Sequence, residues 1–142
     1  MAVHILGLWE LGYNTPLLEL DVWQYPLREF NVNQFYMSPC TGVQSDRLIE
    51  VNNPLDVINK FRRDNIPVVF IDERGSIELQ NFVHPENVLY VFGKVSQSAW
   101  AAYGTNTDQS VFIKTLANTG MMWPHQCAVT LLYDRMNKCQ LR

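Results

Sequence analysis

The chain carries the sequence PVVFI at residues 67–71 and VLYVF at residues 88–92, two apolar runs built from β-branched and aromatic residues. Such runs are typical of strands that are covered on both faces of a parallel sheet. A shorter run, VFI at residues 111–113, repeats the pattern. Loops and helix-like segments separate the three runs, so this stretch predicts strands of one parallel sheet connected by helices.

The N-terminal half contains further elements of the same kind. Val3–Leu8 predicts a first strand, and residues 34–37 predict a second. The pair Asn53-Pro54 predicts the start of an amphipathic helix, because an N-cap residue precedes a proline in the first turn. The inward face of that helix is expected to carry Leu55, Ile58 and Phe61.

Three more helices are predicted. One begins at residues 14–16 and is expected to end at Pro26, and a short one covers residues 97–103 and ends at Gly104. Pro124 opens the last helix. The apolar face of the first is expected to comprise Leu17, Leu18, Leu20, Val22 and Trp23. The stripe of the last comprises Cys127, Ala128, Leu131, Leu132, Arg135, Met136 and Cys139.

Size and composition indicate one folded unit. The chain has 142 residues, 47% of them hydrophobic and 18% charged, which is a globular composition. It shows no linker, no low-complexity run and no internal repeat. We therefore expect residues 1–142 to form a single α/β domain, with a mostly parallel sheet and helices on both faces.

The charge does not favour a surface that is basic overall. The formal net charge is −3, so binding to RNA would need a local basic patch. Lys60, Arg62 and Arg63 form the one basic cluster, with Arg28 and Arg47 elsewhere in the chain. Cations in the last turn of a helix also complement the helix dipole, which is an alternative role for that cluster.

The cysteines and the apolar runs bear on metal and membrane binding. Cys40, Cys127 and Cys139 have no metal-ligand spacing, so we expect buried or partly buried thiols and no metal. No apolar run approaches the roughly 20 residues of a membrane span. The N-terminus lacks the basic region of a signal peptide. A soluble protein in a reducing, cytoplasmic setting is expected.

The carboxyl ends of the predicted strands are the expected place for a ligand, because loops diverge there in open α/β sheets. An apolar loop, residues 121–123, follows the last strand. Together these segments could form a pocket for a flat ring such as adenine. The strand ends are Ile71-Asp72, Phe92-Gly93 and Ile113-Lys114.

From about Val68 to Arg135 the chain resembles the SpoU branch of the SPOUT RNA methyltransferases. The resemblance lies in Phe92-Gly93 after a strand, an Ile-x-x-hydrophobic segment at residues 113–116, HPEN at residues 84–87, and Leu-Tyr-Asp at residues 132–134. It implies a deep C-terminal trefoil knot, a homodimer, and transfer of a methyl group from S-adenosylmethionine to a ribose 2′-hydroxyl of tRNA or rRNA. The cofactor-binding residues that it implies are Ile71, Gly93, Ile113, Leu116 and Met121. Asn14 would be the surviving part of the first catalytic motif.

The chain departs from the family at its catalytic motifs. Pro16 replaces a glycine and Leu20 replaces an arginine of the first motif, and a leucine side chain cannot ionise or donate a hydrogen bond. Val95 stands where the family carries an acid, and Trp123 stands where it carries an asparagine. Because general-base help is worth about 10²–10⁴-fold in rate, these changes imply weakened or lost activity.

Two residues near the last motif remain open to two interpretations. Trp123 is either an aromatic plug that fills the cofactor cavity, which we favour, or a platform on which a base stacks. His125, in the first turn of the last helix, is either a surface or capping residue or a substitute base.

Three functions follow from this sequence. The first is an RNA methyltransferase with a remodelled site, and the second is a non-catalytic knotted module for binding or regulation. The third, a flavodoxin-like domain that binds another ligand, lacks a phosphate-binding glycine-rich loop after its first strand.

Overall fold

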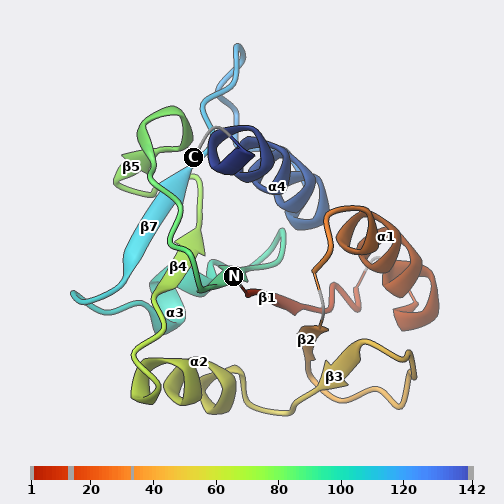
Figure 1. Ribbon diagram of the computed structural model, residues 1–142. Helices are drawn as coiled ribbons and strands as arrows, with labels where there is room; N and C mark the ends of the chain where they lie inside the picture. The colour runs from red at the N-terminus through yellow and green to blue at the C-terminus, as the bar shows by residue number, and fades with distance from the viewer. Residues whose placement is uncertain (1, 13–14, 33, 141–142) are drawn as a thin grey trace.

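The structure of the protein is a computed structural model, and the residues that it describes are 2–12, 15–32 and 34–140. Its strands form one seven-stranded sheet in the order β3-β2-β1-β6-β4-β7-β5, and every pairing in it is parallel (Figure 1). The predicted parallel α/β sheet is therefore confirmed. The strands are β1 (Val3–Leu8), β2 (Gln34–Ser38), β3 (Leu48–Glu50), β4 (Val68–Ile71), β5 (Ile77–Glu78), β6 (Val88–Phe92) and β7 (Gln109–Phe112).

Helices cover both faces of the sheet, as the sequence predicts. α1 and α4 pack on one face, and α2 and α3 pack on the other (Figure 1). The helices are α1 (Pro16–Glu29), α2 (Pro54–Arg63), α3 (Ala99–Tyr103) and α4 (Pro124–Gln140), with a 3₁₀ turn at Leu79–Asn81. None of these helices, in the part of the chain that the structure describes, is long and apolar enough to cross a membrane.

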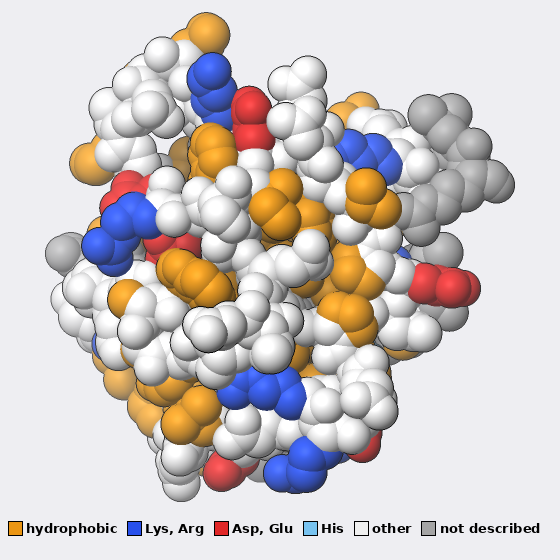
Figure 2. All heavy atoms as spheres, turned by 90° about the vertical axis from the view of Figure 1, so that its left-hand side faces the viewer, with side chains coloured by type: hydrophobic (Ala, Val, Ile, Leu, Met, Phe, Trp, Pro, Cys, Tyr) orange, Lys and Arg blue, Asp and Glu red, His pale blue; other side chains and the backbone are white. Residues whose placement is uncertain are grey.

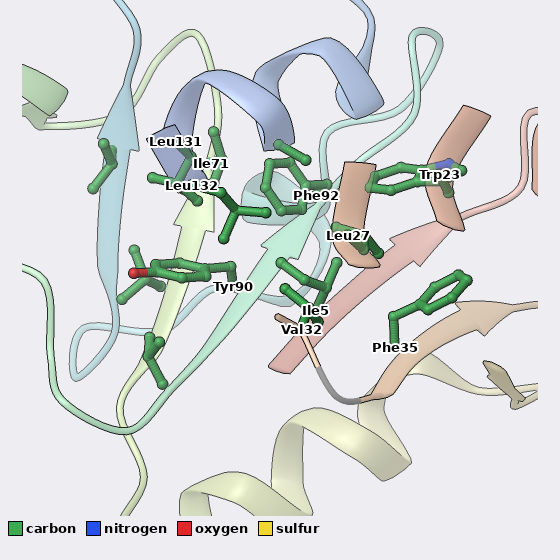
Figure 3. Packing of buried hydrophobic residues seen from close by; sticks show 14 of the residues in the cluster. Ile5, Trp23, Leu27, Val32, Phe35, Ile71, Tyr90, Phe92, Leu131 and Leu132 are labelled. Carbon is green, nitrogen blue, oxygen red and sulfur yellow. The ribbon is translucent and has the colours of Figure 1, made fainter. Parts of the chain in front are cut away.

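The central strands send alternate side chains into two hydrophobic cores. In β6, Tyr90 and Phe92 face α1 and α4, whereas Leu89 and Val91 face α2 and α3. Figure 3 shows Trp23 of α1 directed toward Phe92, and their ring centroids lie 5.8 Å apart. Because the side chains of a strand alternate between faces, an apolar run of this length requires a partner layer on each side.

The predicted starts of α1 and α2 are confirmed. Thr15 caps α1 by accepting a hydrogen bond from the backbone N–H of Leu18 at 3.4 Å, and Asn53 caps α2 through Leu55 N–H at 3.0 Å. A proline follows each cap, where its missing N–H costs nothing. In α2 the inward face is formed by Val57, Ile58 and Phe61, and Leu55 is only partly buried.

The prediction that Pro26 ends the first helix is wrong. α1 continues through Pro26 to Glu29. Proline removes one hydrogen bond, to the carbonyl of Val22, and that residue lies on the exposed side of the helix, where water can replace the bond. The buried face of α1 is Leu20, Trp23 and Leu27, whereas Leu17, Leu18 and Val22 point outward.

Smaller differences concern the strands and the cysteines. β3 and β5 were not predicted, because edge strands of three and two residues carry no clear pattern. β7 begins two residues before the predicted run and ends before Ile113, and α3 begins at Ala99. Cys127 and Cys139 are partly buried, but Cys40 is exposed, contrary to expectation.

The C-terminal half of α4 is fixed by a buried polar network at the amino end of β6. The Arg135 guanidinium donates to the carbonyl oxygens of Pro85 and Glu86 at 2.6 and 2.9 Å, and to the Tyr90 hydroxyl at 3.0 Å. His84 joins the Tyr90 hydroxyl, 2.6 Å from Nδ1, to Asp134, 2.7 Å from Nε2. Burial raises the pKa of Tyr90 to about 12, so the phenol stays protonated and bonded.

Candidate functional site

A pocket of about 970 Å³ lies at the carboxyl ends of β4 and β6. Its wall is completed by the segment that follows β7 and by the start of α4. This is the edge at which the sheet places its diverging loops, as expected for a ligand site in an α/β fold. The volume lies within the range of small-molecule sites, about 300–1,000 Å³.

The residues singled out from the sequence as cofactor-binding meet in this pocket. They come from three separate segments, the end of β4, the end of β6, and the loop after β7. Asn14 lies outside the described residues. All five predicted cofactor-binding residues are among those that line the pocket: Ile71, Gly93, Ile113, Leu116 and Met121.

Gly93 directly follows β6 and has a specific steric role. A Cβ atom there would lie 2.5 Å from the carbonyl oxygen of Gln97 and 2.8 Å from the backbone nitrogen of Ala99. The φ angle of Gly93 lies outside the left-handed region, so close approach of its own loop, and not backbone strain, requires the glycine. A side chain here would push this loop, which lines the pocket, out of position.

Three attachments hold the loop at residues 94–98. Lys94 and Gln97 exchange backbone hydrogen bonds at 3.0 Å, which closes a tight turn. The hydroxyl of Ser98 donates to the carboxylate of Asp72 at the end of β4. The backbone N–H of Ser96 donates to the carboxylate of Glu10, 3.2 Å away at the end of β1.

Glu10 is itself held by a second buried carboxylate. Both side-chain oxygens of Glu19 lie 3.0 Å from the backbone nitrogen of Glu10, and the two side chains are 4% and 3% exposed. Burial raises the pKa of Glu19, and the nearby Glu10 carboxylate acts in the same direction. The bond from Glu10 N–H and the charge of Lys94 lower that pKa and so oppose the effect.

Sequence reasoning missed Glu10 and Glu19. The contact between Glu10 and Ser96 joins residues 86 positions apart, and only the pairing of β1 with β6 brings them together. The one local hint is an acidic residue directly after an apolar strand. That pattern is common at strand ends and is not specific to a site.

The loop from Lys114 to Met122 is exposed along its whole length. In Figure 1 this segment, between β7 and α4, projects from the body of the molecule. Figure 2 shows hydrophobic side chains near the tip of the corresponding projection at the upper left. Leu116 and Met121 are its largely exposed apolar residues, and both line the pocket. Gly120 has a φ of +68°, a left-handed conformation that residues with side chains rarely adopt.

Trp123 lies in the pocket wall. The pocket of about 970 Å³ remains open beside it, so the preferred interpretation of Trp123 as a plug is wrong for this structure. The backbone N–H of Trp123 donates to the side chain of Gln126 at 2.8 Å, which fixes the backbone of Trp123 just before α4. The ring centroid of His125 lies 6.2 Å from that of Trp23, against which it packs. His125 is not among the pocket-lining residues, and burial lowers its pKa.

The positions that depart from the family motifs have different surroundings. Leu20 is 2% exposed and belongs to the core between α1 and the sheet, so the site of the expected arginine is here a packing position. Val95 is 53% exposed and lines the pocket. Neither side chain can transfer a proton.

The ionisable groups at the pocket wall are two carboxylates, the cations Arg74 and Lys94, and the thiol of Cys127. Asp72 is bound to Ser98 and to the backbone N–H of Arg74 at 2.9 Å, whereas Glu73 is exposed. Burial raises the pKa of Cys127 to about 11, so its thiol is protonated at neutral pH and is a poor nucleophile. Among the described residues, no group of three or more His, Cys, Asp or Glu side chains could hold a metal ion.

Comparisons with known proteins identify solved structures with a similar fold. No protein-family model and no curated protein sequence matches the chain. Solved structures do match it. The SpoU methyltransferase AviRb from Streptomyces viridochromogenes, in complex with S-adenosylmethionine, superposes with a TM-score of 0.77 at 15% identity. The chain has the fold of the SpoU methyltransferases.

Two further structures agree with this SpoU-type fold. An RNA 2′-O ribose methyltransferase superposes with a TM-score of 0.78 at 14% identity over 98% of this chain. A protein described for 2′-OH methylation of C/U34 on tRNA superposes with a TM-score of 0.76 at 12% identity, over 99% of this chain and 98% of its own. The chain spans 61% of AviRb and 57% of the ribose methyltransferase.

Proposed function

We propose that the pocket at the carboxyl ends of β4 and β6 binds S-adenosylmethionine. The observation that carries the proposal is the meeting of Ile71, Gly93, Ile113, Leu116 and Met121 around one open cavity. The resemblance to SpoU methyltransferases implies a cofactor role for these residues, and they come from three segments that the fold brings together. The complex of AviRb with this cofactor, on the same fold, supports the choice of ligand.

The chemistry of the pocket wall fits that ligand. Ile113, Leu116 and Met121 offer an apolar surface to an adenine ring. The cofactor carries both cationic groups and a carboxylate, and the wall offers charges of both signs, from Asp72 and Glu73 and from Arg74 and Lys94. Backbone groups of residues 93–98 are available for hydrogen bonds that fix the orientation of a bound molecule.

The proposed reaction is methylation of a ribose 2′-hydroxyl in tRNA or rRNA, weakened or lost in this chain. The cofactor would supply the electrophilic methyl group. Removal of the hydroxyl proton needs a base, and the three substituted positions, Leu20, Val95 and Trp123, provide none. We therefore propose a cofactor-binding protein with little turnover. The alternative is a module that keeps the scaffold for binding or regulation and has no catalysis.

An exposed apolar face supports assembly into a homodimer. Leu18, Val22 and Tyr25 lie outward on α1, and Val129 and Tyr133 lie outward on α4. The two helices pack against each other, so their exposed residues can form one surface (Figure 1). A cyclic dimer would bury such a face against its own copy. Light scattering tests this proposal, and a monomer at micromolar concentration contradicts it.

Several further expectations remain proposals. We propose that residues 1–142 act as one domain, that the chain around the pocket forms a deep trefoil knot, and that the protein works in the cytoplasm. RNA is the proposed partner, through a limited contact area, because Lys and Arg side chains on the face in Figure 2 alternate with acidic and neutral ones. No role for a metal is proposed.

Calorimetric titration with S-adenosylmethionine is the deciding experiment. We expect saturable binding with a dissociation constant in the micromolar to sub-millimolar range, and no heat of binding at millimolar ligand contradicts the proposal. Transfer of a tritiated methyl group to total tRNA or rRNA then separates the two alternatives. Incorporation above that of a Gly93→Ala variant indicates residual catalysis, and none indicates the binding module.

A further inference from the structure

One attachment of the pocket loop comes from a part of the chain that does not touch the pocket. The residues at 94–98 all line the cavity, and their shape depends on the contacts that they make behind it. Two of those contacts lie within the pocket wall itself, between Lys94 and Gln97 and between Ser98 and Asp72. The third reaches back to Glu10, which is not a pocket-lining residue.

The contact of Glu10 with Ser96 uses both oxygens of the carboxylate. One accepts from the backbone N–H of Ser96 at 3.2 Å, and the other accepts from its hydroxyl at 3.4 Å. Glu10 is 4% exposed, so water does not compete freely for these bonds. Hydrogen bonds to a charged acceptor are stronger than neutral ones, and low local dielectric strengthens them further.

The backbone around Glu10 is in turn held by contacts to two other elements, β2 and α1. Its preceding residue, Trp9, extends the β1–β2 ladder through a backbone bond to Ser38 at 2.9 Å. Its own N–H is held by the carboxylate of Glu19 in the first turn of α1. The carboxylate of Glu10 therefore projects from a rigid support, which is what a group must have to position a loop.

We propose that Glu10 is a positioning residue of the pocket, which holds the loop at residues 94–98 in the shape that binds the cofactor. The proposal rests on the proposed function, and it extends that function by making affinity for the ligand depend on a residue outside the cavity. Without the carboxylate, the N–H of Ser96 loses its partner and the loop keeps only the contacts at its two ends. The loop then adopts several conformations, and the apparent affinity for the cofactor is reduced to the fraction of molecules that have the binding conformation.

The experiment compares two substitutions of Glu10 with one control. Glu10→Ala removes both acceptors, whereas Glu10→Gln keeps an oxygen for the N–H of Ser96 and an amide for its hydroxyl. Asn53→Ala removes the cap of α2, far from the pocket, and so destabilises the fold without touching the loop. For each protein, two quantities are measured: the dissociation constant of S-adenosylhomocysteine, and the rate of amide hydrogen exchange at Ser96.

We expect Glu10→Ala to weaken binding by about tenfold or more and to accelerate exchange at Ser96 by a similar factor. Glu10→Gln is expected to stay within about threefold of the natural chain in both measurements, and Asn53→Ala to leave both unchanged. Such rescue by the amide, with no effect of the cap, is not expected of a merely structural residue. Equal losses in Glu10→Ala and Asn53→Ala overturn the proposal.

The exchange measurement separates this inference from the proposed function. If the natural chain binds no S-adenosylhomocysteine or S-adenosylmethionine, the proposed function fails, and Ser96 exchange alone decides the role of Glu10. Faster exchange in Glu10→Ala that Glu10→Gln reverses still supports the positioning role. Unchanged exchange overturns that role whether or not a ligand binds.

Discussion

The two ends of α4 are held in opposite ways. Its first turn lines the open pocket, after a loop in which every residue from Lys114 to Met122 is exposed. Its C-terminal half is bound to the segment at residues 79–90, mostly through buried or partly buried groups. Arg135 and Lys138 of α4 donate to carbonyl oxygens of that segment, and Asp134 of α4 contacts His84. One helix thus joins a well-fixed amino end of the sheet to a loosely covered carboxyl end.

The difference shows how this fold separates stability from binding. Buried charge-assisted hydrogen bonds fix one end strongly, because leaving their partners unsatisfied is costly. The loops at the other end bury little apolar surface and belong to the low-stability part of the molecule. Changes at the amino end should therefore lower the free energy of unfolding, whereas changes at the pocket should mainly alter affinity for a ligand.

The largest expected effect is at Arg135. Arg135→Met keeps the length of the side chain but leaves two carbonyl oxygens and the Tyr90 hydroxyl without their donor. We expect the free energy of unfolding to fall by about 3 kcal/mol. Urea denaturation measures it, with Arg63→Ala, an exposed cation of α2, as the control. A loss below about 1 kcal/mol, or a larger effect on ligand affinity than on stability, would contradict the assignment of stability to the amino end of the sheet.

Gly93→Ala should affect both properties. The added methyl group must displace the backbone at Gln97 and Ala99, and such overpacking costs about 1–3 kcal/mol. Because the displaced loop lines the pocket, binding of S-adenosylhomocysteine should weaken more than tenfold. Gly12→Ala is the matched control, since no atom lies within 4 Å of a Cβ at that position. Unchanged binding in Gly93→Ala would show that the loop is not part of the site.

Trp123→Ala distinguishes a stacking platform from a plug. If the indole in the pocket wall supports a bound ring, its removal should weaken binding by about tenfold, since stacking is worth about 1–3 kcal/mol. Trp123→Phe, which keeps an aromatic face, should recover most of the affinity. Tighter binding in Trp123→Ala would restore the plug interpretation.

The pH dependence of stability sharpens the description of the amino end. Burial lowers the pKa of His84 below its ordinary 6.5, against the opposing effect of Asp134. The unfolded chain then binds more protons than the folded one at pH values just below 6.5, so stability falls as pH decreases through that range. The pKa values of His4 and His125 are lowered too and act with the same sign.

We expect His84→Gln to show a shallower fall in stability between pH 7 and pH 5.5 than the natural chain. Chemical denaturation at several pH values measures the slope, and His125→Gln provides the comparison at the pocket end of α4. An unchanged slope in His84→Gln would mean that the buried imidazole does not contribute to the acid sensitivity.

The smallest effect on stability is expected at Leu116. This side chain is fully exposed, so Leu116→Ser should change the free energy of unfolding by less than about 0.5 kcal/mol. Because Leu116 lines the pocket, affinity for S-adenosylhomocysteine should still fall by about threefold. A clear loss of stability would show that the exposed loop packs in solution, contrary to the comparison.

Most of the fold was accessible from sequence because its signals are local. The runs in β1, β4 and β6 and the capped starts of α1 and α2 are read from a few adjacent residues. Where the local signal was weak or misleading, prediction failed. Pro26 lies inside a helix that its neighbours stabilise through packing, and the edge strands β3 and β5 depend on pairing with a neighbour.

The candidate site likewise has a part that local sequence patterns predict and a part that depends on long-range contacts. The strand ends at Ile71, Gly93 and Ile113 and the apolar loop at Met121 could be placed together because parallel strands end at one edge. Leu116 and the role of these residues in cofactor binding followed only from the resemblance to SpoU methyltransferases. Glu10 could not be named, since its role depends on a contact across 86 residues. The sequence also could not show that the pocket beside Trp123 is open, because an indole side chain can either line a cavity or fill it.

The sequence by itself determined the central strands, which are covered on both faces, and the capped starts of α1 and α2, since apolar runs and caps act over a strand or a turn. Only the tertiary structure decided which loops meet, which carboxylates are buried, and which end of α4 is fixed. These properties depend on the strand order β3-β2-β1-β6-β4-β7-β5, in which neighbours in space are far apart along the chain. Contacts of that kind arise from packing over the whole chain, and no local pattern records them.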